Sequence, residues 1–220
     1  MSSTSFGELV LVVGDHHIPM RAQSIPSQFR KMLVPGKVQR VLCTGNIGCY
    51  EEYDRLRTLV GGNSSNVHCV VGRYDFAYPT SSAFSSSSPP PPPLPPSSAK
   101  MMHMPSFPET KVVQLGNFRV GIIGGHQVVP WGDMFALSMV RRRLGVDVLI
   151  SGNRRKEGIV EYEGGHYLFP GSITGAYDAC TPNVNPSFIL LAVQGSKIVC
   201  YVYELRNGEV DVSKTEFTKE

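Results

Sequence analysis

The sequence lacks a long apolar run, a strong net charge and a signal segment. No stretch of about 18 consecutive apolar residues occurs, so we expect no helix that spans a membrane and no direct membrane insertion. The net charge is only +3 at pH 7, which argues against nucleic acid as the main partner. The first residues lack the basic and apolar regions of a secretory signal, so we expect a cytoplasmic protein.

Cysteines are few, and their arrangement does not suggest disulfides. They are odd in number, scattered, and three lie in or beside apolar runs that are typical of strands. We therefore expect reduced thiols in a cytosolic protein rather than a disulfide framework. The cysteines are Cys43, Cys49, Cys69, Cys180 and Cys200.

The first third of the chain alternates between strand and helix patterns. Residues 8–13, 38–43 and 67–71 are apolar runs, and each ends near a glycine, as buried parallel strands do. Residues 51–60 place apolar side chains on one helical stripe. The chain therefore begins β-α-β-α-β, which predicts a sheet that contains parallel strands and is covered by helices.

The remainder of the chain has hairpin patterns. Residues 111–115 and 118–123 flank a two-residue turn, and Asp133 is expected to cap a helix that ends near Arg143 and Gly145. After a strand at 146–150 come three hairpin-like pairs, with Gly164-Gly165 and Asn207-Gly208 as their clearest turns. We predict an α/β fold in which residues 1–220 form a single domain of two packed sheets with helices outside.

Residues 79–104 do not fit this pattern. This segment is rich in serine and contains a proline run at 89–96, so it has little apolar surface with which to offset its ordering entropy. We expect a disordered, dispensable Ser/Pro-rich insertion within the domain. Either it has no partner, or a proline-reading domain docks at 89–96.

Polar residues follow the predicted strands, at the sheet edge where α/β proteins bind ligands. The first strand is followed by Gly14-Asp-His-His17, the second by Gly45-Asn46, and the third by Gly72-Arg-Tyr-Asp75. Later strands are followed by Gly124-Gly-His126 and by Gly152-Asn-Arg-Arg155. These segments are expected to meet in one pocket.

In this order, the motifs resemble the calcineurin-like metallophosphoesterases. Val34-Pro-Gly-Lys37, Leu42-Cys-Thr-Gly-Asn46, Gly125-His-Gln-Val-Val-Pro-Trp-Gly-Asp133 and Pro170-Gly-Ser-Ile-Thr-Gly-Ala-Tyr177 resemble, more specifically, the small phosphoesterase-fold subunits of retromer. This resemblance covers nearly the whole chain outside the insertion and the first seven residues. It implies an αββα sandwich of two mixed sheets with helices outside.

The resemblance also implies a two-metal pocket of seven side chains, of which four are replaced here. The retained positions are Asp15, His17 and Asn46, and the replaced positions are Arg73, Gly124, Asn153 and Arg155. The catalytic histidine of the family falls on Tyr74. Arginine offers no lone pair and stays protonated, so we expect no catalysis, no catalytic residue and no metal cofactor.

Three alternatives stay open for this pocket. Asp15 and His17 hold a single, weakly bound divalent ion, or the chain is a metal-dependent phosphoesterase with a depleted site, or the arginines hold a phosphate-like anion. We expect instead that Arg155, together with Arg73, reaches Asp15 and substitutes a fixed charge for the ion.

For function, the resemblance implies a non-catalytic scaffold of retromer in endosome-to-Golgi retrograde and recycling transport, located in the cytoplasm and peripherally on endosomal membranes. Its implied partner is the C-terminal helical-repeat region of vacuolar protein sorting-associated protein 35. The implied contact residues are Ile18, Val129, Pro130 and Trp131, around the pocket. Simple packing of that loop is the alternative.

A second surface follows from the turn at Asn207-Gly208. Its register places Tyr201, Tyr203, Leu205, Val210 and Val212 on one side of a hairpin and Glu204 with Asp211 on the other. Composition alone favours the apolar side as core. The resemblance implies instead an exposed patch that binds regulatory Pro-Leu peptides, formed by Leu9, Leu190, Tyr201, Tyr203, Val210 and Val212.

Overall fold

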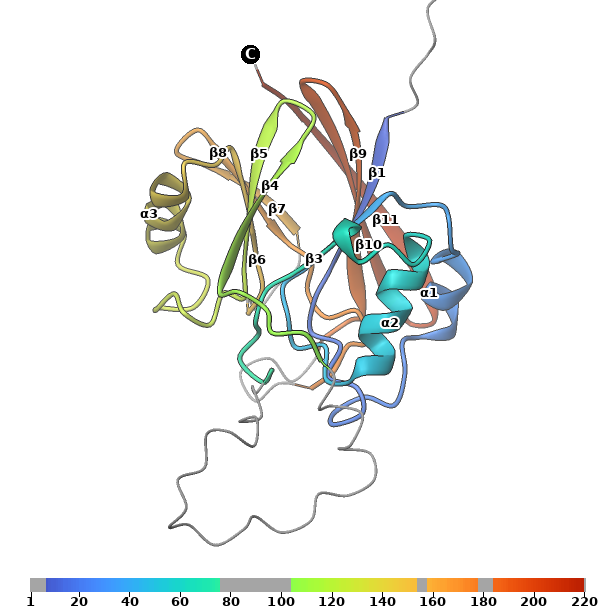
Figure 1. Cartoon of the computed structure of the whole chain (residues 1–220). Coiled ribbons are helices and arrows are strands. Elements are labelled where there is room, and N and C mark those ends of the chain that lie inside the picture. The colour runs from blue at the N-terminus through green and yellow to red at the C-terminus, as the bar shows by residue number, and fades with distance from the viewer. Residues whose placement is uncertain (1–6, 76–103, 154–157, 178–183, 220) are drawn as a thin grey trace, which may run out of the picture.

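The computed structural model describes residues 7–75, 104–153, 158–177 and 184–219. Two mixed sheets pack face to face, and the helices cover their outer faces, which gives the expected αββα sandwich (Figure 1). The helices are α1 (Ser27–Met32), α2 (Tyr50–Leu59), the 3-10 turn η1 (Ser64–Asn66) and α3 (Met134–Leu144). The strands are β1 (Glu8–Val13), β2 (Arg40–Cys43), β3 (Val67–Cys69), β4 (Thr110–Leu115), β5 (Phe118–Ile123), β6 (Val148–Ser151), β7 (Gly158–Tyr162), β8 (Gly165–Phe169), β9 (Ser187–Gln194), β10 (Lys197–Arg206) and β11 (Glu209–Thr218).

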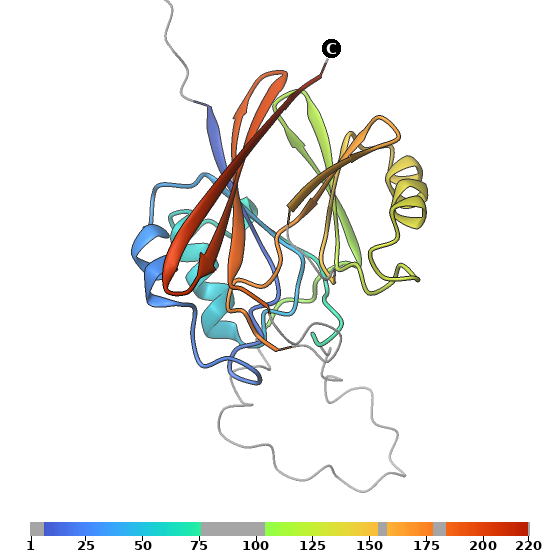
Figure 2. The ribbon, with the colours of Figure 1, turned by 180° about the vertical axis from the view of Figure 1, so that it is seen from behind.

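The six-stranded sheet has the order β11-β10-β9-β1-β2-β3, and the five-stranded sheet has the order β4-β5-β6-β8-β7. Strands β1, β2 and β3 are parallel, as are β5, β6 and β8. The long hairpin β10–β11 forms the far edge of the six-stranded sheet, and Figure 2 shows it from behind. Both sets of parallel strands therefore end at the same edge of the sandwich, where the strand-end pocket forms.

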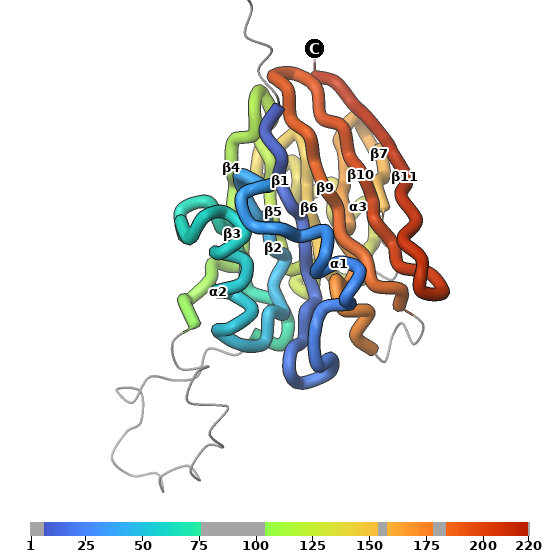
Figure 3. The backbone as a smooth tube through the Cα atoms, turned by 90° about the vertical axis from the view of Figure 1, so that its right-hand side faces the viewer, coloured from blue at the N-terminus to red at the C-terminus, as the bar shows by residue number. Residues whose placement is uncertain are grey.

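Three apolar clusters hold these layers together. The largest fills the space between the sheets with buried side chains such as Val12, Ile122, Ile150 and Leu191. A second packs α1 and α2 onto the six-stranded sheet, whose outer face is toward the viewer in Figure 3. The third lies between α3 and the five-stranded sheet, around Leu137. Burial of these side chains provides the main stabilisation of the fold.

The predicted helix after Asp133 is confirmed together with its ends. The Asp133 carboxylate accepts a 2.7 Å hydrogen bond from the backbone N–H of Ala136, which satisfies one of the free donors at the start of α3. Gly145 ends the helix with φ 61°, a left-handed conformation that glycine adopts at little cost.

Several strand boundaries differ from the sequence predictions by one to a few residues. The β7–β8 turn is Glu163-Gly164 rather than Gly164-Gly165, because Tyr162 pairs with Gly165. Strand β3 ends at Cys69. Beyond it, the backbone N–H of Val71 donates to the carbonyl oxygen of Pro108 and no longer to β2. The turn at Asn207-Gly208 and the Arg206–Glu209 pairing are confirmed.

Some predictions fall outside the described residues. They are the Ser/Pro-rich insertion, apart from Met104, its proline run at 89–96, and Arg155. Of the helices in the described ranges, none has the length and apolar character that crossing a membrane requires.

Candidate functional site

The strand-end pocket is built on four residues with left-handed backbones. Asp15 and His17 follow β1 with φ 50°, Asn46 follows β2 with φ 56°, and Asn153 follows β6 with φ 54°. Residues other than glycine rarely adopt positive φ, and such conformations concentrate at functional sites. The structure therefore brings together the described ligand positions that the sequence had predicted, on tightly turned strand ends.

Asp15 and Asn46 are joined directly. The Asn46 side-chain nitrogen donates a 2.6 Å hydrogen bond to Oδ1 of Asp15, and the Asn46 side-chain oxygen accepts a 2.8 Å bond from the N–H of Tyr74. His17 Nε2 lies 3.8 Å from the same Asp15 oxygen. Both ends of the Asn46 amide are therefore engaged by the protein, and one Asp15 oxygen is already a hydrogen-bond acceptor.

A further carboxylate, that of Asp75, joins the loop after β2 to the loop after β3 by hydrogen bonds. It accepts hydrogen bonds from the backbone N–H groups of Asn46 (2.6 Å), Ile47 (3.0 Å) and Gly72 (2.9 Å). Burial raises the pKa of the Asp75 carboxyl group, and these amide donors act in the opposite direction. Sequence reasoning assigned Asp75 no role. Its position in the turn that begins at Gly72 was only a weak local signal, because two of the amides that it binds belong to another loop.

The structure leaves no room for a side chain at Gly124, the position that the resemblance assigns to a metal-binding histidine. A Cβ atom on Gly124 would lie 2.4 Å from the carbonyl oxygen of Val71 and 2.8 Å from the ring of His126. The first of these atoms belongs to the backbone and cannot turn away. This position therefore lacks an imidazole, and backbone atoms also fill the space that a side chain would need.

Arg73 turns toward the rim of the pocket. Its guanidinium carbon lies 4.6 Å from the ring centroid of Trp131 and 5.3 Å from that of Tyr74. This placement differs from the expected pairing of Arg73 with Asp15. The stacking follows from the attraction of a guanidinium to aromatic faces, which keeps the charge close to water.

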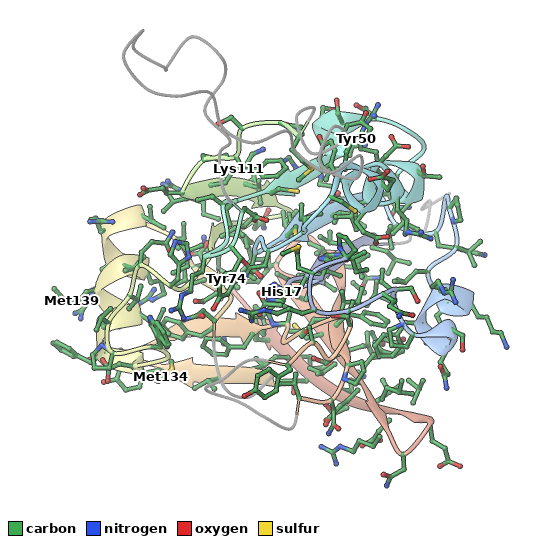
Figure 4. The ribbon with its side chains drawn as sticks, turned by 90° about the horizontal axis from the view of Figure 1, so that it is seen from below. His17, Tyr50, Tyr74, Lys111, Met134 and Met139 are labelled. Carbon is green, nitrogen blue, oxygen red and sulfur yellow. The ribbon has the colours of Figure 1, made fainter. Side chains whose placement is uncertain are left out.

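Tyr74, to which the resemblance assigns the position of the catalytic histidine, is surrounded by two arginines and an imidazole. The Arg21 guanidinium carbon lies 4.1 Å from its ring centroid, and the His17 ring meets it edge-on at 5.4 Å. Figure 4 shows His17 and Tyr74 side by side. A phenol is a much weaker acid than an imidazolium, so it is a poor substitute for histidine as a proton donor to a leaving group.

His16 and His126 lie close to the pocket without a visible role in ligand binding. His16 is fully buried, and neither ring nitrogen has a hydrogen-bond partner among the described residues. Burial lowers the pKa of His16 to about 3, and the neighbouring His17 and Arg55 act in the same direction. Burial also lowers the pKa of His126. Both imidazoles are therefore neutral at physiological pH.

The residues present do not fit the two-metal centre of the family. Such a centre needs oxygen and imidazole donors around both ions. Here the Asn46 oxygen accepts the N–H of Tyr74, Gly124 supplies no donor, and Arg73 carries a positive charge. A single ion held through Oδ1 of Asp15 and His17 would have to compete with the Asn46 hydrogen bond. Within the described ranges, no cluster of three or more His, Cys, Asp or Glu side chains could hold a metal.

The rim of the pocket carries the apolar residues that the sequence proposed as a partner contact. We use the name rim for Val129, Pro130 and Trp131. All three are exposed, Val129 at 76% and Trp131 at 41% of their full accessible surface. Ile18, proposed for the same contact, is only 6% exposed and packs in the cluster beneath α1 and α2. Its side chain therefore serves the core rather than this surface.

A second apolar surface lies on the outer face of the six-stranded sheet. We call it the groove; it is lined by Leu9, Met32, Leu33, Val34, Lys37, Val38, Leu59, Phe188, Leu190 and Tyr203 and has a volume of about 80 Å³. The predicted patch residues Leu9, Leu190 and Tyr203 lie in this lining. Tyr201, Val210 and Val212 lie beside it on the β10–β11 hairpin, and Val212 is exposed.

The two sides of β10 differ in burial, which bears on whether the apolar side of the hairpin is core or surface. Its even-numbered residues from Ile198 to Glu204 are buried, and Glu204 accepts a 2.6 Å hydrogen bond from Asn185. The odd-numbered side, with Tyr201, Tyr203 and Leu205, is half-buried, and Tyr203 and Leu205 pack against the cluster beneath α1 and α2. Composition alone favoured this side as core; the structure buries the opposite side of β10 more deeply and leaves this one partly open to solvent.

Comparison with known proteins places the chain in a family. Residues 9–196 match the calcineurin-like phosphoesterase superfamily domain. Vacuolar protein sorting-associated protein 29 of Schizosaccharomyces pombe is 34% identical over 96% of this chain and 98% of its own. The structure of Vacuolar Protein Sorting 29 from Cryptosporidium parvum is 40% identical, with a TM-score of 0.80 over 98% of this chain and 100% of that chain.

Two other similar structures contain ligands. Wild-type Vps29 of Entamoeba histolytica, solved as a complex with Zn²⁺, is 39% identical, with a TM-score of 0.76 over 94% of this chain and 98% of that one. Vps29 of Chaetomium thermophilum, solved with a cyclic peptide, is 32% identical, with a TM-score of 0.73 over 97% and 98%. These matches confirm the resemblance that the motifs indicated: the chain belongs to the calcineurin-like phosphoesterase superfamily and, within it, to the family of vacuolar protein sorting-associated protein 29.

Proposed function

We propose that this protein is a non-catalytic scaffold subunit of retromer, acting in endosome-to-Golgi retrograde and recycling transport. In this role it sits peripherally on endosomal membranes through its partners. Its rim binds the C-terminal helical-repeat region of vacuolar protein sorting-associated protein 35, and its groove binds regulatory peptides with a Pro-Leu motif.

The observation that carries the proposal is the pairing of an exposed apolar rim with a pocket unsuited to catalysis. Val129 and Trp131 are large apolar side chains that are exposed to solvent. Their loop is ordered by a 3.3 Å hydrogen bond from the indole N–H of Trp131 to the carbonyl oxygen of His126. Exposed aromatic and aliphatic anchors on an ordered loop are typical of interface centres. The arginine that stacks on Trp131 orders the same surface.

The groove supports the second part of the proposal. Its lining is almost entirely aliphatic and aromatic, with Lys37 as its one charged residue. Phe188 and Tyr203 stack in parallel with ring centroids 4.6 Å apart, which fixes one wall. A concave apolar surface of this kind favours burial of a short peptide's aliphatic side chain. The cyclic-peptide complex of the Chaetomium thermophilum relative shows that a family member binds a peptide.

The alternative function is a metal-dependent phosphoesterase with a depleted site. It draws support from the retained Asp15, His17 and Asn46 and from the zinc complex of the Entamoeba histolytica relative. Against it stand Gly124, which has no room for a ligand, and Tyr74, which replaces the catalytic acid. A single zinc ion held by Asp15 and His17 is compatible with the scaffold role.

Two point variants and two ligands test the proposal. Val129→Asp places a carboxylate in the centre of the rim, where an interface would leave it unpaired at a cost of several kcal/mol. We expect it to abolish binding of the helical-repeat partner in calorimetry and to leave a Pro-Leu peptide bound. Leu190→Glu should do the reverse, because it charges the groove.

Matched controls separate binding from folding. Val112 is 40% exposed on β4, so Val112→Asp should leave both ligands bound and should match the melting temperature of Val129→Asp. Loss of both ligands in either test variant would indicate misfolding. Unchanged binding of the helical-repeat partner to Val129→Asp would place its interface elsewhere, and phosphatase turnover with added manganese would restore the enzyme alternative.

A further inference from the structure

The groove has the size and chemistry of a receptor for one aliphatic side chain. An apolar cavity of about 150 Å³ holds a benzene molecule, and the groove, at about 80 Å³, is roughly half as large. Its walls come from β1, β9, β10, the end of α1 and the loop after it. An exposed apolar hollow of this kind is normally covered by a partner or by another part of the chain.

A matching side chain is present in the same polypeptide. Leu94 is the one residue other than proline in the run Pro89-Pro-Pro-Pro-Pro-Leu-Pro-Pro96. Proline fixes φ, so a segment of this composition loses little backbone freedom when it binds. The four residues on each side of this run, Ser85–Ser88 and Ser97-Ser-Ala-Lys100, offer no large aliphatic side chain; Phe84 and Met101 are the next apolar residues.

The attachment of this segment lies on the same face as the groove. Met104 and Phe107, just after it, pack against the cluster that also contacts Leu9, Leu190 and Tyr203. The Phe107 ring lies 5.6 Å from that of Tyr53 in α2, and Leu59, at the end of α2, lines the groove. Tyr53 and Leu59 are about 9 Å apart along the helix, given a rise of about 1.5 Å per residue.

The connecting chain is long enough for this distance. Leu94 precedes Phe107 by 13 residues, and such a stretch spans up to about 45 Å when extended. On the other side, 19 residues separate Asp75 from Leu94, which allows up to about 65 Å. Neither arm therefore prevents Leu94 from reaching the groove of its own chain.

We propose that Leu94 and its flanking prolines bind in the groove of the same molecule and compete there with outside peptides. This inference rests on the proposed function of the groove as a peptide site and adds a regulation of it. A flexible tether gives an effective concentration on the order of 1 mM. With an intrinsic dissociation constant of about 0.1 mM, the segment would weaken an outside peptide about tenfold.

The test uses the full chain and its Leu94→Ser variant. Methyl NMR spectra should differ at Leu9 and Leu190 between the two, because the leucine leaves the groove. A synthetic peptide of residues 86–99, titrated into Leu94→Ser, should return these methyl signals toward their wild-type positions. In calorimetry the same peptide should bind Leu94→Ser about tenfold more tightly than wild type. Phe84→Ser is the matched control, since it removes an apolar residue outside the proline run and should behave as wild type.

Each other outcome is informative. Identical spectra and affinities for wild type and Leu94→Ser would overturn self-binding, as would a synthetic peptide that fails to bind Leu94→Ser. Signals that shift with protein concentration would place Leu94 in the groove of a second copy and overturn binding in cis. If regulatory Pro-Leu peptides bind and Leu190→Glu blocks them while Leu94 has no effect, the proposed function stands without this regulation. If Leu190→Glu blocks no peptide, the function proposed for the groove itself fails.

Discussion

The guanidinium of Arg73 lies over the indole ring of Trp131, with 4.6 Å between its carbon and the ring centroid. The resemblance assigns Arg73 to a position of a metal ligand, and Trp131 belongs to the exposed rim. If that assignment holds, the same arginine takes a donor from the pocket and orders the surface beside it. The pocket and the rim are coupled through this pair.

This coupling can be measured in a double-mutant cycle of Arg73→Ala and Trp131→Leu. A cation over an aromatic ring at a partly exposed site contributes about 0.5–1 kcal/mol. We expect Arg73→Ala to lower the free energy of unfolding by about that amount in the wild-type background and by less when Trp131 is absent. Urea unfolding of the four proteins gives the interaction energy. Additive effects would show that the stack contributes nothing.

Gly124 should resist the return of a metal ligand. Because its Cβ would lie 2.4 Å from the Val71 carbonyl oxygen, Gly124→His must move backbone. We expect it to lower the free energy of unfolding by about 1–3 kcal/mol, as overpacking does, and to gain no stabilisation from manganese. Gly124→Ala is the control that adds the Cβ without the imidazole, and it should lose a similar amount. A rise in melting temperature on adding manganese to Gly124→His would contradict the closed pocket.

The sequence predicts an ion pair between Asp15 and Arg155. Arg155 lies outside the described residues. A guanidinium beside Asp15 would supply the charge of the missing ion. We predict that Arg155→Ala lowers the free energy of unfolding by roughly 1–3 kcal/mol if the pair is largely buried. The metal content of the purified protein should be measured in parallel. We expect no stoichiometric metal. Zinc bound at Asp15 and His17 would remove the need for the pair.

His16 should make stability depend on pH. Burial lowers its pKa from 6.5 to about 3, so the folded protein keeps this imidazole neutral. Above pH 6.5 both states are neutral and the stabilisation is complete. As the pH falls from 6.5 toward 3, the unfolded chain takes up a proton that the folded chain does not, and stability is lost at up to about 1.4 kcal/mol per pH unit.

The variant His16→Gln isolates this contribution. Urea unfolding between pH 7.5 and 4.5 should give a shallower loss of stability for His16→Gln than for wild type. His68, whose pKa burial lowers to about 4, titrates in an overlapping range and is less buried. His68→Gln therefore serves as the comparison: it should flatten the curve to a similar extent down to about pH 4, and the two variants should differ only below that pH, where folded His68 also takes up a proton. Parallel curves for wild type and His16→Gln would assign the acid sensitivity to other groups.

Local pattern was sufficient to predict most of the architecture. The apolar runs at β1 and β2, the Asp133 and Gly145 ends of α3, and the Arg206–Glu209 turn follow from short-range rules of burial, capping and hairpin geometry. Their errors are shifts of one or two residues. The family was indicated by the resemblance of the motifs, while the pocket followed from the gathering of polar residues at strand ends along one edge of the sheet.

The contents of the pocket were predictable in identity but not in arrangement. The sequence shows that Arg73 and Gly124 are not metal ligands. It does not show that Arg73 turns to Trp131 or that the Val71 carbonyl closes the space beside Gly124. Both depend on contacts between segments about 50 residues apart. Asp75 was missed for the same reason, since two of its three donors come from a different loop.

The sequence by itself determined the order and type of most elements, the residue types at the strand ends and the apolar character of the two candidate surfaces. Only the tertiary structure decided which of those apolar residues face water. Ile18 is buried while Val129, in the same expected contact, is exposed, and the side of β10 that carries Glu204 is buried more deeply than the side with Tyr203. The physical reason is that periodicity fixes which side chains share a face, whereas burial of that face depends on what packs against it from elsewhere in the chain.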